Sequence, residues 1–220
     1  RRKATAYLAT EALNVGGDFI EAGVFRGGTA IIMFGILACN NASERTLWLA
    51  DSFAGLPKPE WHEGDKGGKQ EAWDGLSKKW TASQFELNKN FDKFGGWYNE
   101  LPVVSLGRLG QWQDAHREIL AGWFKDTLPT APIEKVAFLR CDADMYSSTL
   151  ECLTTMYPKI SSGGFVYIDD YHEFDACQRA VDEYRLSVQS REPLYTIVED
   201  GDFHFVEDMT EEQVRLHRET

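Results

Sequence analysis

The sequence has little that would mark a disulfide-stapled, membrane-spanning or zinc-binding protein. Its four cysteines show no CxxC spacing and sit among apolar residues, so we expect reduced core residues. No apolar run approaches the length of a bilayer crossing and no signal peptide is visible, which together predict a cytoplasmic protein without a membrane span. The length and the share of hydrophobic residues are typical of a single globular domain with a full core.

Basic charge is also scarce. The chain has 23 Lys and Arg against 35 Asp and Glu, a formal net charge of −12, and its basic residues form no concentrated patch. Such a surface repels a phosphate backbone, so we expect a small-molecule substrate and no nucleic-acid partner.

Two apolar runs that end in acidic residues are the most informative feature. The first run leads into Asp142 and Asp144, and the second leads into Asp169 and Asp170. Both are rich in β-branched and aromatic residues, which predicts buried strands. The segment 147–160 between them has the length of a helical crossover, so the strands are expected to be parallel neighbours.

The four carboxylates would then gather at the carboxyl edge of a sheet, where open α/β folds bind ligands. Carboxylates packed so closely repel one another unless a cation compensates their charge, or unless water and raised pKa values do. Ligands that are all oxygen favour a hard ion such as Mg²⁺. Exposed helix-capping acids are the alternative, which explains one aspartate well and four poorly.

A strand, a glycine-rich turn and a helix are predicted over residues 18–39. The turn presents backbone N–H groups to an anionic ligand group, although its glycines at 23, 27 and 28 do not follow the GxGxxG spacing of a nicotinamide-binding turn. The next strand, 46–53, contains Asp51 near its end, where an acid commonly accepts hydrogen bonds from the two ribose hydroxyls of a nucleoside cofactor. A helix-capping role is the alternative for this residue.

Residues 57–112 differ in character from the rest and form a predicted insertion within a single domain, 1–220. Five of the seven tryptophans lie there, around one helix predicted over 83–94 that Ser83 and Glu86 cap and Gly95-Gly96 end. Long irregular insertions are usually lids or binding loops. The tryptophans either stack on a flat or sugar-like acceptor or anchor the insertion to the core.

The remaining segments alternate between predicted helices and strands. Helices are expected over 3–14 and 175–190, a strand over 118–124 whose end supplies Gly122 and Trp123 to an adenine pocket, a hairpin over 194–206, and a last helix from Thr210. Alternating β and α elements closed by a hairpin predict an α/β three-layer fold.

Five blocks of the chain together resemble the macrocin O-methyltransferase family. They are Glu-Ala-Gly-Val-Phe-Arg-Gly-Gly at 21–28, Asp-Ser-Phe-Ala-Gly-Leu-Pro at 51–57, Gly-Trp-Phe-Lys-Asp-Thr-Leu-Pro at 122–129, Asp-Ala-Asp-Met-Tyr at 142–146 and Asp-Asp-Tyr at 169–171. The resemblance implies a class I methyltransferase (Rossmann-like) fold, with a mostly parallel seven-stranded sheet closed by a C-terminal hairpin. It also implies S-adenosyl-L-methionine and Mg²⁺ as cofactors, a sugar or glycoside hydroxyl as acceptor in antibiotic biosynthesis, and a homodimer or larger assembly.

The same resemblance carries roles onto residues. It places metal ligands at Asp142, Asp169 and Asp170 and the general base at Asp144. It places cofactor contacts at Glu21, Gly23, Gly27, Gly28, Thr29, Asp51, Ser52, Gly122, Trp123 and Asp142. His172 is a competing base because it follows a strand-end acid pair, although a lone histidine is more often structural.

Other protein classes share parts of this pattern. A metal-dependent glycosyltransferase also uses Asp-x-Asp after an apolar strand, but it does not require the glycine turn, Asp51 and the second acid pair together. A haloacid-dehalogenase-type phosphatase would have Thr or Ser where this chain has Tyr146. The third alternative is a cofactor-binding protein that has lost catalysis.

Overall fold

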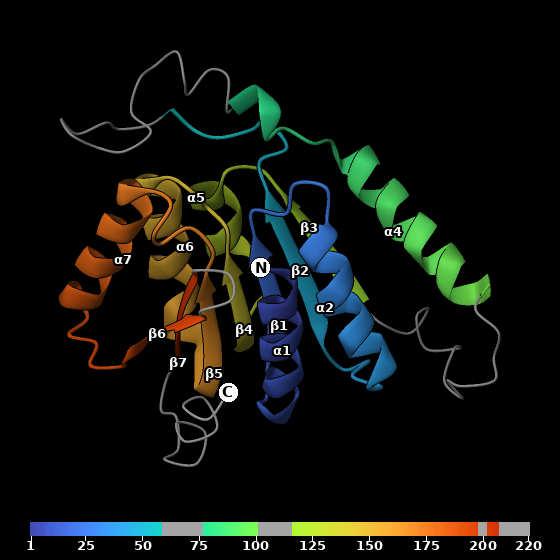
Figure 1. The fold of residues 1–220 in the computed structure, drawn as a ribbon, viewed down its shortest axis with the longest axis horizontal. Helices are drawn as coiled ribbons and strands as arrows, with labels where there is room; N and C mark the ends of the chain where they lie inside the picture. Colours follow the sequence, from blue (N-terminus) through green and yellow to red (C-terminus); the bar gives the residue numbers. More distant parts are fainter. Residues whose placement is uncertain (59–76, 101–115, 198–201, 207–220) are drawn as a thin grey trace.

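A twisted β-sheet runs through the middle of the molecule, with helices on both of its faces (Figure 1). The structure, a computed structural model, describes residues 1–58, 77–100, 116–197 and 202–206. Its strand order is β3-β2-β1-β4-β5-β7-β6. The strands are β1 Asp18–Ala22, β2 Thr46–Asp51, β3 His116–Ala121, β4 Val136–Cys141, β5 Ile160–Ile168, β6 Leu194–Ile197 and β7 Asp202–Val206. Strands β1 to β5 are parallel, which confirms the predicted α/β class with a parallel sheet.

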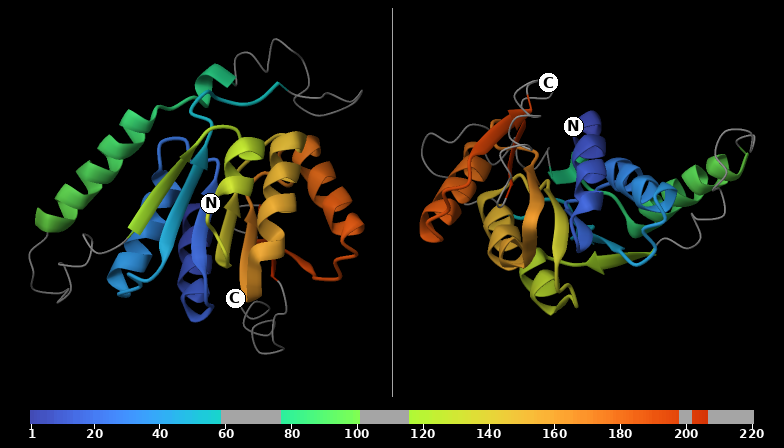
Figure 2. Two further views of the ribbon diagram at one scale, coloured as in Figure 1. Left: turned by 180° about the vertical axis from the view of Figure 1, so that it is seen from behind. Right: turned by 90° about the horizontal axis from the view of Figure 1, so that it is seen from below.

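The helices form two layers (Figure 2). One layer contains α1 Arg2–Glu11, α2 Gly28–Cys39 and α4 Gln84–Glu100, and the other contains α5 Phe124–Thr127, α6 Tyr146–Met156 and α7 Asp175–Ser187. Short 3₁₀ turns, Ala12–Asn14, Leu128–Thr130 and Tyr157–Lys159, follow α1, α5 and α6. The three-layer arrangement follows from the sequence alternation of strands and helices.

The two faces of the sheet bury different residues because successive strand side chains point in opposite directions. Phe19 and Phe138 point toward α1 and α2 and meet edge to face, with ring centroids 5.7 Å apart. Ile20 and Leu139, their chain neighbours, belong to the core beneath α6 and α7. Since both faces are covered, these strands are mostly apolar along their length, as buried parallel strands are, with Glu21 and Arg140 as charged exceptions.

The strand order reverses direction between β1 and β4. The chain proceeds from β1 outward to β2 and β3, then returns to β4 on the other side of β1. Open α/β sheets bind ligands in the crevice beyond the carboxyl ends of the strands at such a switch point. Both predicted ligand-binding segments, the turn after β1 and the acids after β4 and β5, meet here.

Several predicted boundaries differ from the structure. Helix α4 continues to Glu100, past the predicted stop at Gly95-Gly96, because glycine lowers helix stability by about 1 kcal/mol per residue without forcing an end. Strand β3 ends at Ala121, so Gly122 and Trp123 lie in the connection to α5. Strands β6 and β7 pair antiparallel and β7 pairs with β5. The turn between β6 and β7, the predicted helix from Thr210 and most of the insertion lie outside the described residues.

Candidate active site

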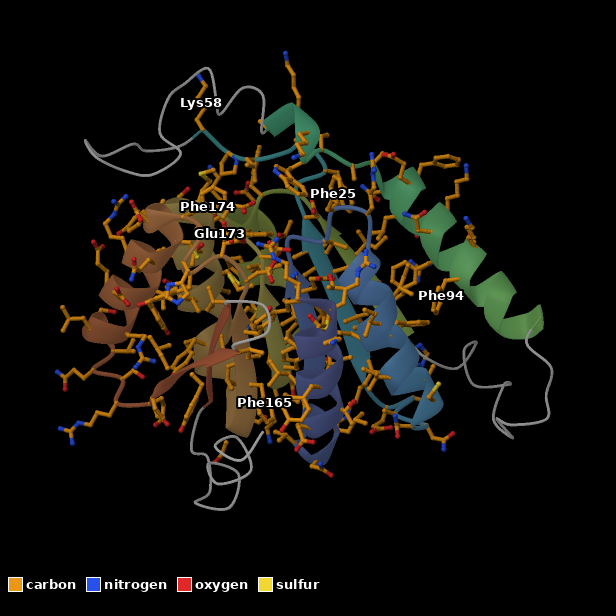
Figure 3. All side chains as sticks on the ribbon, viewed as in Figure 1. Phe25, Lys58, Phe94, Phe165, Glu173 and Phe174 are labelled. Atoms are coloured by element: carbon orange, nitrogen blue, oxygen red, sulfur yellow. The ribbon has the colours of Figure 1, made fainter. Side chains whose placement is uncertain are left out.

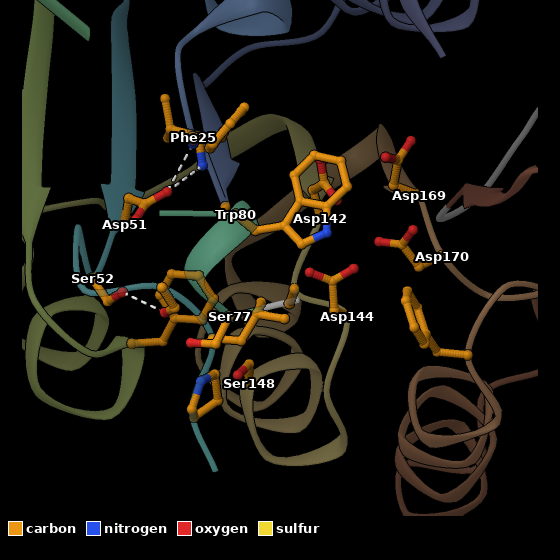
Figure 4. Close-up of a pocket in the computed structure, with 18 of the residues that line it drawn as sticks. Phe25, Asp51, Ser52, Ser77, Trp80, Asp142, Asp144, Ser148, Asp169 and Asp170 are labelled. Carbon is orange, nitrogen blue, oxygen red and sulfur yellow. Dashed lines mark hydrogen bonds between the residues drawn. The ribbon is translucent and has the colours of Figure 1, made fainter. Parts of the chain in front are cut away.

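A cavity of about 910 Å³ opens at the carboxyl edge of the sheet, at the switch point between β1 and β4 (Figure 4). Its volume is typical of sites that hold small organic ligands. Residues from the ends of five parallel strands contribute to its wall. The predicted site residues on the wall are Gly23, Gly28, Thr29, Asp51, Ser52, Trp123, Asp142, Asp144, Asp169 and Asp170.

The turn between β1 and α2 forms one side of the cavity and depends on glycine. Gly23 has φ +91, and a Cβ there would lie 1.8 Å from the carbonyl oxygen of Asp142. The backbone N–H of Gly23 donates to Ala50 and that of Asp142 donates to Ala22, so β1 is in close contact with both neighbouring strands at this point. Only glycine fits where two strand ends approach so closely at a positive φ.

Asp51, at the end of β2, holds this turn in place. Its Oδ2 accepts hydrogen bonds from the backbone N–H groups of Val24 and Phe25, both at 2.8 Å, and its Oδ1 accepts one from Phe53 at 2.7 Å. A carboxylate offers about four acceptor positions, so one remains for a ligand. Asp51 therefore has room for fewer ligand hydrogen bonds than the predicted pair of ribose hydroxyls would need.

The other residues near the turn are ordered by short-range contacts. Ser52 donates from its hydroxyl to the carbonyl of Gly55 at 2.8 Å and so closes the turn after β2. Thr29, in the first turn of α2, donates from its hydroxyl to Oε1 of Glu21. Trp123 is 38% exposed and contributes to the cavity wall.

The acidic cluster forms the opposite side of the cavity, as Figure 4 shows. One carboxylate oxygen from each of Asp142, Asp144 and Asp170 lies within 4.8 Å of the other two, a grouping that can hold a metal ion. Asp169 is fully buried beside them. The geometry thus brings all four predicted acids together, with Asp144 inside the closest group and Asp169 at its edge.

Burial and mutual repulsion perturb the acids of the cluster. Burial, followed by the charge of Asp142, raises the pKa of Asp144 to about 7. The pKa of Asp170 is raised well above its usual range by burial and then by Asp144 and Asp142. Burial also acts against ionisation of Asp142, but the charge of Arg140 and hydrogen bonds from Asp170 and Arg140 together lower that pKa. The described residues therefore fit a divalent cation, because the donors are all oxygen and a cation would relieve the repulsion that raises the pKa values of Asp144 and Asp170.

Two arginines that the sequence patterns did not single out enter the site. Arg140, within β4, is buried and contacts Glu21, Asp142 and Asp169. Arg1 lies 3.3 Å from Asp169 and 3.1 Å from Asp170, with its side chain 45% exposed. The sequence could have indicated Arg140, because it is a charged residue inside an otherwise apolar strand. A buried charged residue of this kind needs a partner of opposite charge.

Four predicted site residues do not line the cavity. Glu21 is fully buried behind the wall, and Gly27 caps α2 in a left-handed conformation against Leu87. Gly122 binds the carbonyl of Asp51 through its N–H but contributes no surface. His172 is exposed and packs edge-on against Tyr171, in the turn after β5, so the structure places this competing base off the cavity wall.

Trp80 is the one described tryptophan of the insertion whose side chain can be placed. Its indole lines the cavity, is 42% exposed, and meets the ring of Phe25 edge-on with centroids 5.4 Å apart. Figure 4 shows it between Asp51 and the acidic cluster. Trp61, Trp73 and Trp112 lie outside the described residues.

Comparison with known proteins assigns the chain to a family. The family model described as macrocin O-methyltransferase (TylF) matches residues 2–205. The chain belongs to the macrocin O-methyltransferase family. The glycosyltransferase and phosphatase alternatives for Asp142-x-Asp144 are therefore wrong, and membership agrees with the parallel sheet and the cavity at its switch point.

Two relatives show the extent of the match. Demethyldecarbamoylnovobiocin O-methyltransferase of Streptomyces niveus is 41% identical over 188 residues, 86% of this chain and 65% of the relative. Mycinamicin III 3''-O-methyltransferase of Micromonospora griseorubida is 40% identical over 177 residues, 78% of this chain and 61% of the relative. The chain thus spans less than two thirds of the length of these two curated relatives.

A solved structure supports the methyltransferase fold. The O-methyltransferase NovP superposes with a TM-score of 0.78 at 37% identity, over 95% of this chain and 80% of that one. In the described part of the chain, no helix combines the length and apolar character that a bilayer crossing requires.

Proposed function

We propose that the protein transfers a methyl group from S-adenosyl-L-methionine to a hydroxyl of a sugar or glycosylated small molecule, with the help of Mg²⁺. The observation that carries the proposal is the cavity itself. It combines a glycine turn with Asp51 on one side and four clustered carboxylates on the other, in a chain of the macrocin O-methyltransferase family. The two named relatives are O-methyltransferases of demethyldecarbamoylnovobiocin and of the 3'' position of mycinamicin III, which supports a related hydroxyl acceptor here.

The turn after β1 and the end of β2 are proposed to hold the donor. Backbone N–H groups at the start of α2 suit its carboxylate, and Asp51 has an acceptor position left for one ribose hydroxyl. Trp123 offers a flat surface to the adenine ring. Methyl transfer is an in-line displacement, so these contacts serve to fix the methyl group opposite the acceptor oxygen.

Asp142, Asp169 and Asp170 are proposed to hold the cation, and Asp144 to accept the proton of the acceptor hydroxyl. A divalent cation bound there would lower the pKa of that hydroxyl. Asp144 is supported as proton acceptor by its position on the cavity wall within 4.8 Å of Asp142 and Asp170. Because Asp144 belongs to the group with Asp142 and Asp170, it is the alternative to Asp169 as the third ligand of the cation.

The insertion over 57–112 is proposed to cover the acceptor. Trp80 already reaches the cavity from it, and an indole excludes water and stacks on a sugar face. Hydrogen exchange over residues 77–94 should slow when donor product and acceptor are both bound. Equal exchange with and without ligands would contradict a covering role.

We also infer that β6 and β7 complete a seven-stranded class I methyltransferase sheet, that the protein forms a homodimer or larger assembly, and that it takes no nucleic-acid partner. Light scattering after gel filtration tests the assembly. A monomer at micromolar concentration would contradict that part alone.

The decisive experiment offers labelled S-adenosyl-L-methionine with demethyldecarbamoylnovobiocin, mycinamicin III and simple deoxysugar glycosides as acceptors. We expect one acceptor to gain a methyl group, activity to disappear in EDTA, and Mg²⁺ to restore it. Full activity in excess EDTA would remove the metal from the proposal. Donor binding without transfer to any hydroxyl compound would support the binding-only alternative instead.

A further inference from the structure

Arg140 occupies an unusual place for a charged residue. It lies in β4, in which all six residues are buried, and its side chain is 2% exposed. Its register partners are Glu21 on β1 and Tyr167 on β5. The guanidinium carbon lies 5.7 Å from the centre of the Tyr167 ring. The residue is thus buried on the same face of the sheet as Phe138 and Tyr167, and it also contributes to the cavity wall.

One guanidinium contacts carboxylates from three neighbouring strands. Its Nη1 donates to Oε1 of Glu21 at 2.9 Å and to Oδ2 of Asp142 at 2.8 Å. Its Nη2 lies 2.8 Å from Oδ2 of Asp169. These acids sit on β1 and just beyond the ends of β4 and β5, which are adjacent in the sheet. Arg140 therefore fixes the relative positions of three strand ends.

Stability alone does not account for such a residue. Desolvating an arginine and its partners costs several kcal/mol, and buried ion pairs can often be replaced by apolar residues without loss of stability. The alternating neighbours Phe138 and Leu139 show that apolar side chains pack well in the same strand. An apolar residue at position 140 could not hold the three carboxylates in place.

The contacts engage one oxygen of each aspartate. Arg140 meets Asp142 and Asp169 through their Oδ2 atoms. A carboxylate has two oxygens with about four acceptor positions, so the hydrogen bond to Asp142 and the ion pair with Asp169 orient each group through Oδ2 and do not involve Oδ1. Partners that orient metal-binding carboxylates in this manner tune the geometry of metal sites.

The contact with Glu21 extends the connection to the donor side of the cavity. Oε1 of Glu21 accepts from both Arg140 and the hydroxyl of Thr29, which lies in the first turn of α2 on the cavity wall. Since Glu21 itself does not line the cavity, its effect on either ligand passes through these two residues.

We propose that Arg140 is a positioning residue that holds Asp142 and Asp169 in the arrangement a divalent cation requires, and that links this cation site to the donor-binding turn through Glu21 and Thr29. The inference rests on the proposed function, because it concerns the same cavity. It assigns to Arg140 no contact with the acceptor and no part in proton transfer.

The variant Arg140→Lys tests the positioning role because it keeps the positive charge but not the planar fork that reaches three carboxylates. Mg²⁺ demands near-ideal octahedral geometry, whereas Ca²⁺ tolerates irregular sites. Calorimetry should therefore show affinity for Mg²⁺ falling about 10-fold or more, while affinity for Ca²⁺ falls much less. A general loss of stability would not change the ratio of the two affinities.

Arg45→Lys is the matched control. Arg45 is also mostly buried, but it donates to the carbonyls of Ala12, Leu13 and Gly17, away from the cavity. It should lose stability without altering the ratio of Mg²⁺ to Ca²⁺ affinity. If the unmodified protein binds Mg²⁺ but Arg140→Lys leaves the ratio of Mg²⁺ to Ca²⁺ affinity unchanged, the inference is overturned and the proposed function still stands. Absence of Mg²⁺ binding in the unmodified protein would instead remove the metal from the proposed function and this inference with it.

The link to the donor side is tested first in the unmodified protein and then in Arg140→Lys. In the unmodified protein, saturating S-adenosylhomocysteine should change the affinity for Mg²⁺ by about 5-fold or more, and Mg²⁺ should change the affinity for S-adenosylhomocysteine by the same factor. In Arg140→Lys this factor should approach one. Independent binding of the two ligands to the unmodified protein would overturn the link.

Discussion

Replacing Asp51 with alanine should weaken donor binding and loosen the turn that surrounds the donor. The carboxylate accepts three backbone hydrogen bonds, from Val24, Phe25 and Phe53, and has about one acceptor position left. Phe25 and Phe53 have φ values of 51 and 52, so these hydrogen bonds hold two non-glycine residues in a left-handed conformation.

The magnitude follows from those contacts. One hydrogen bond from a ribose hydroxyl to a charged acceptor contributes about 1.5 to 3 kcal/mol, which corresponds to a loss of donor affinity of roughly 10- to 150-fold. The three backbone hydrogen bonds are partly accessible to water, so their loss should lower the free energy of unfolding by about 1 kcal/mol each. Both effects should therefore appear in Asp51→Ala.

Calorimetry with S-adenosylhomocysteine and its 2′-deoxy and 3′-deoxy analogues separates the ribose contact from the loosened turn. The unmodified protein should bind one of the deoxy analogues more weakly, and Asp51→Ala should no longer distinguish that analogue from the parent compound. Asp18→Ala is the matched control, because Asp18 accepts from the backbone of Thr46 and the indole of Trp48 away from the cavity. Unchanged donor affinity in Asp51→Ala, or equal binding of all three ligands by the unmodified protein, would refute the reasoning.

Further predictions concern the glycine turn, the proton acceptor and the response to pH. Gly23→Ala should lower the free energy of unfolding by more than about 4 kcal/mol in urea titrations, because the added Cβ would meet a backbone oxygen. Gly28→Ala should change the free energy of unfolding by less than about 1 kcal/mol, because nothing lies within 4 Å of a Cβ at that position. Similar values for the two variants would contradict the packing argument. Asp144→Asn should reduce turnover by roughly 10²- to 10⁴-fold while Mg²⁺ affinity stays within a few-fold, and a large loss of Mg²⁺ affinity would make Asp144 a ligand in place of Asp169. Burial raises the pKa of Glu21 from 4.5 to about 7, so the folded state holds its proton longer than the unfolded state, and stability should fall by on the order of 3 kcal/mol as pH rises from about 4.5 through 7. Glu21→Gln should lack this contribution while it keeps the one from Asp144, whose raised pKa acts in the same direction, so the difference between the two proteins isolates Glu21; parallel stability curves would show that Glu21 contributes no pH dependence.

Local patterns in the sequence were sufficient to predict the layered α/β fold and to recognise the family. Apolar runs that end in acidic residues predict buried strands. The intervening segment 147–160 has the length of a helical crossover, which predicts that the two strands are parallel neighbours. The clustering of the four aspartates followed from those two facts, because the carboxyl ends of adjacent parallel strands share one edge. Figure 3 shows how closely the side chains of both layers fill the space around that sheet.

Only the tertiary structure decided how the site is held together. Asp51 lines the cavity as expected, yet two of its about four acceptor positions are taken by backbone N–H groups 26 and 27 residues away in the chain. Arg140 and Glu21 are 119 residues apart in the chain, and they meet because β4 returns to lie beside β1. A pattern along the chain specifies which side chains are buried and polar, but hydrogen bonds between strands are directional and short, so their partners are fixed only once strand order and register are set.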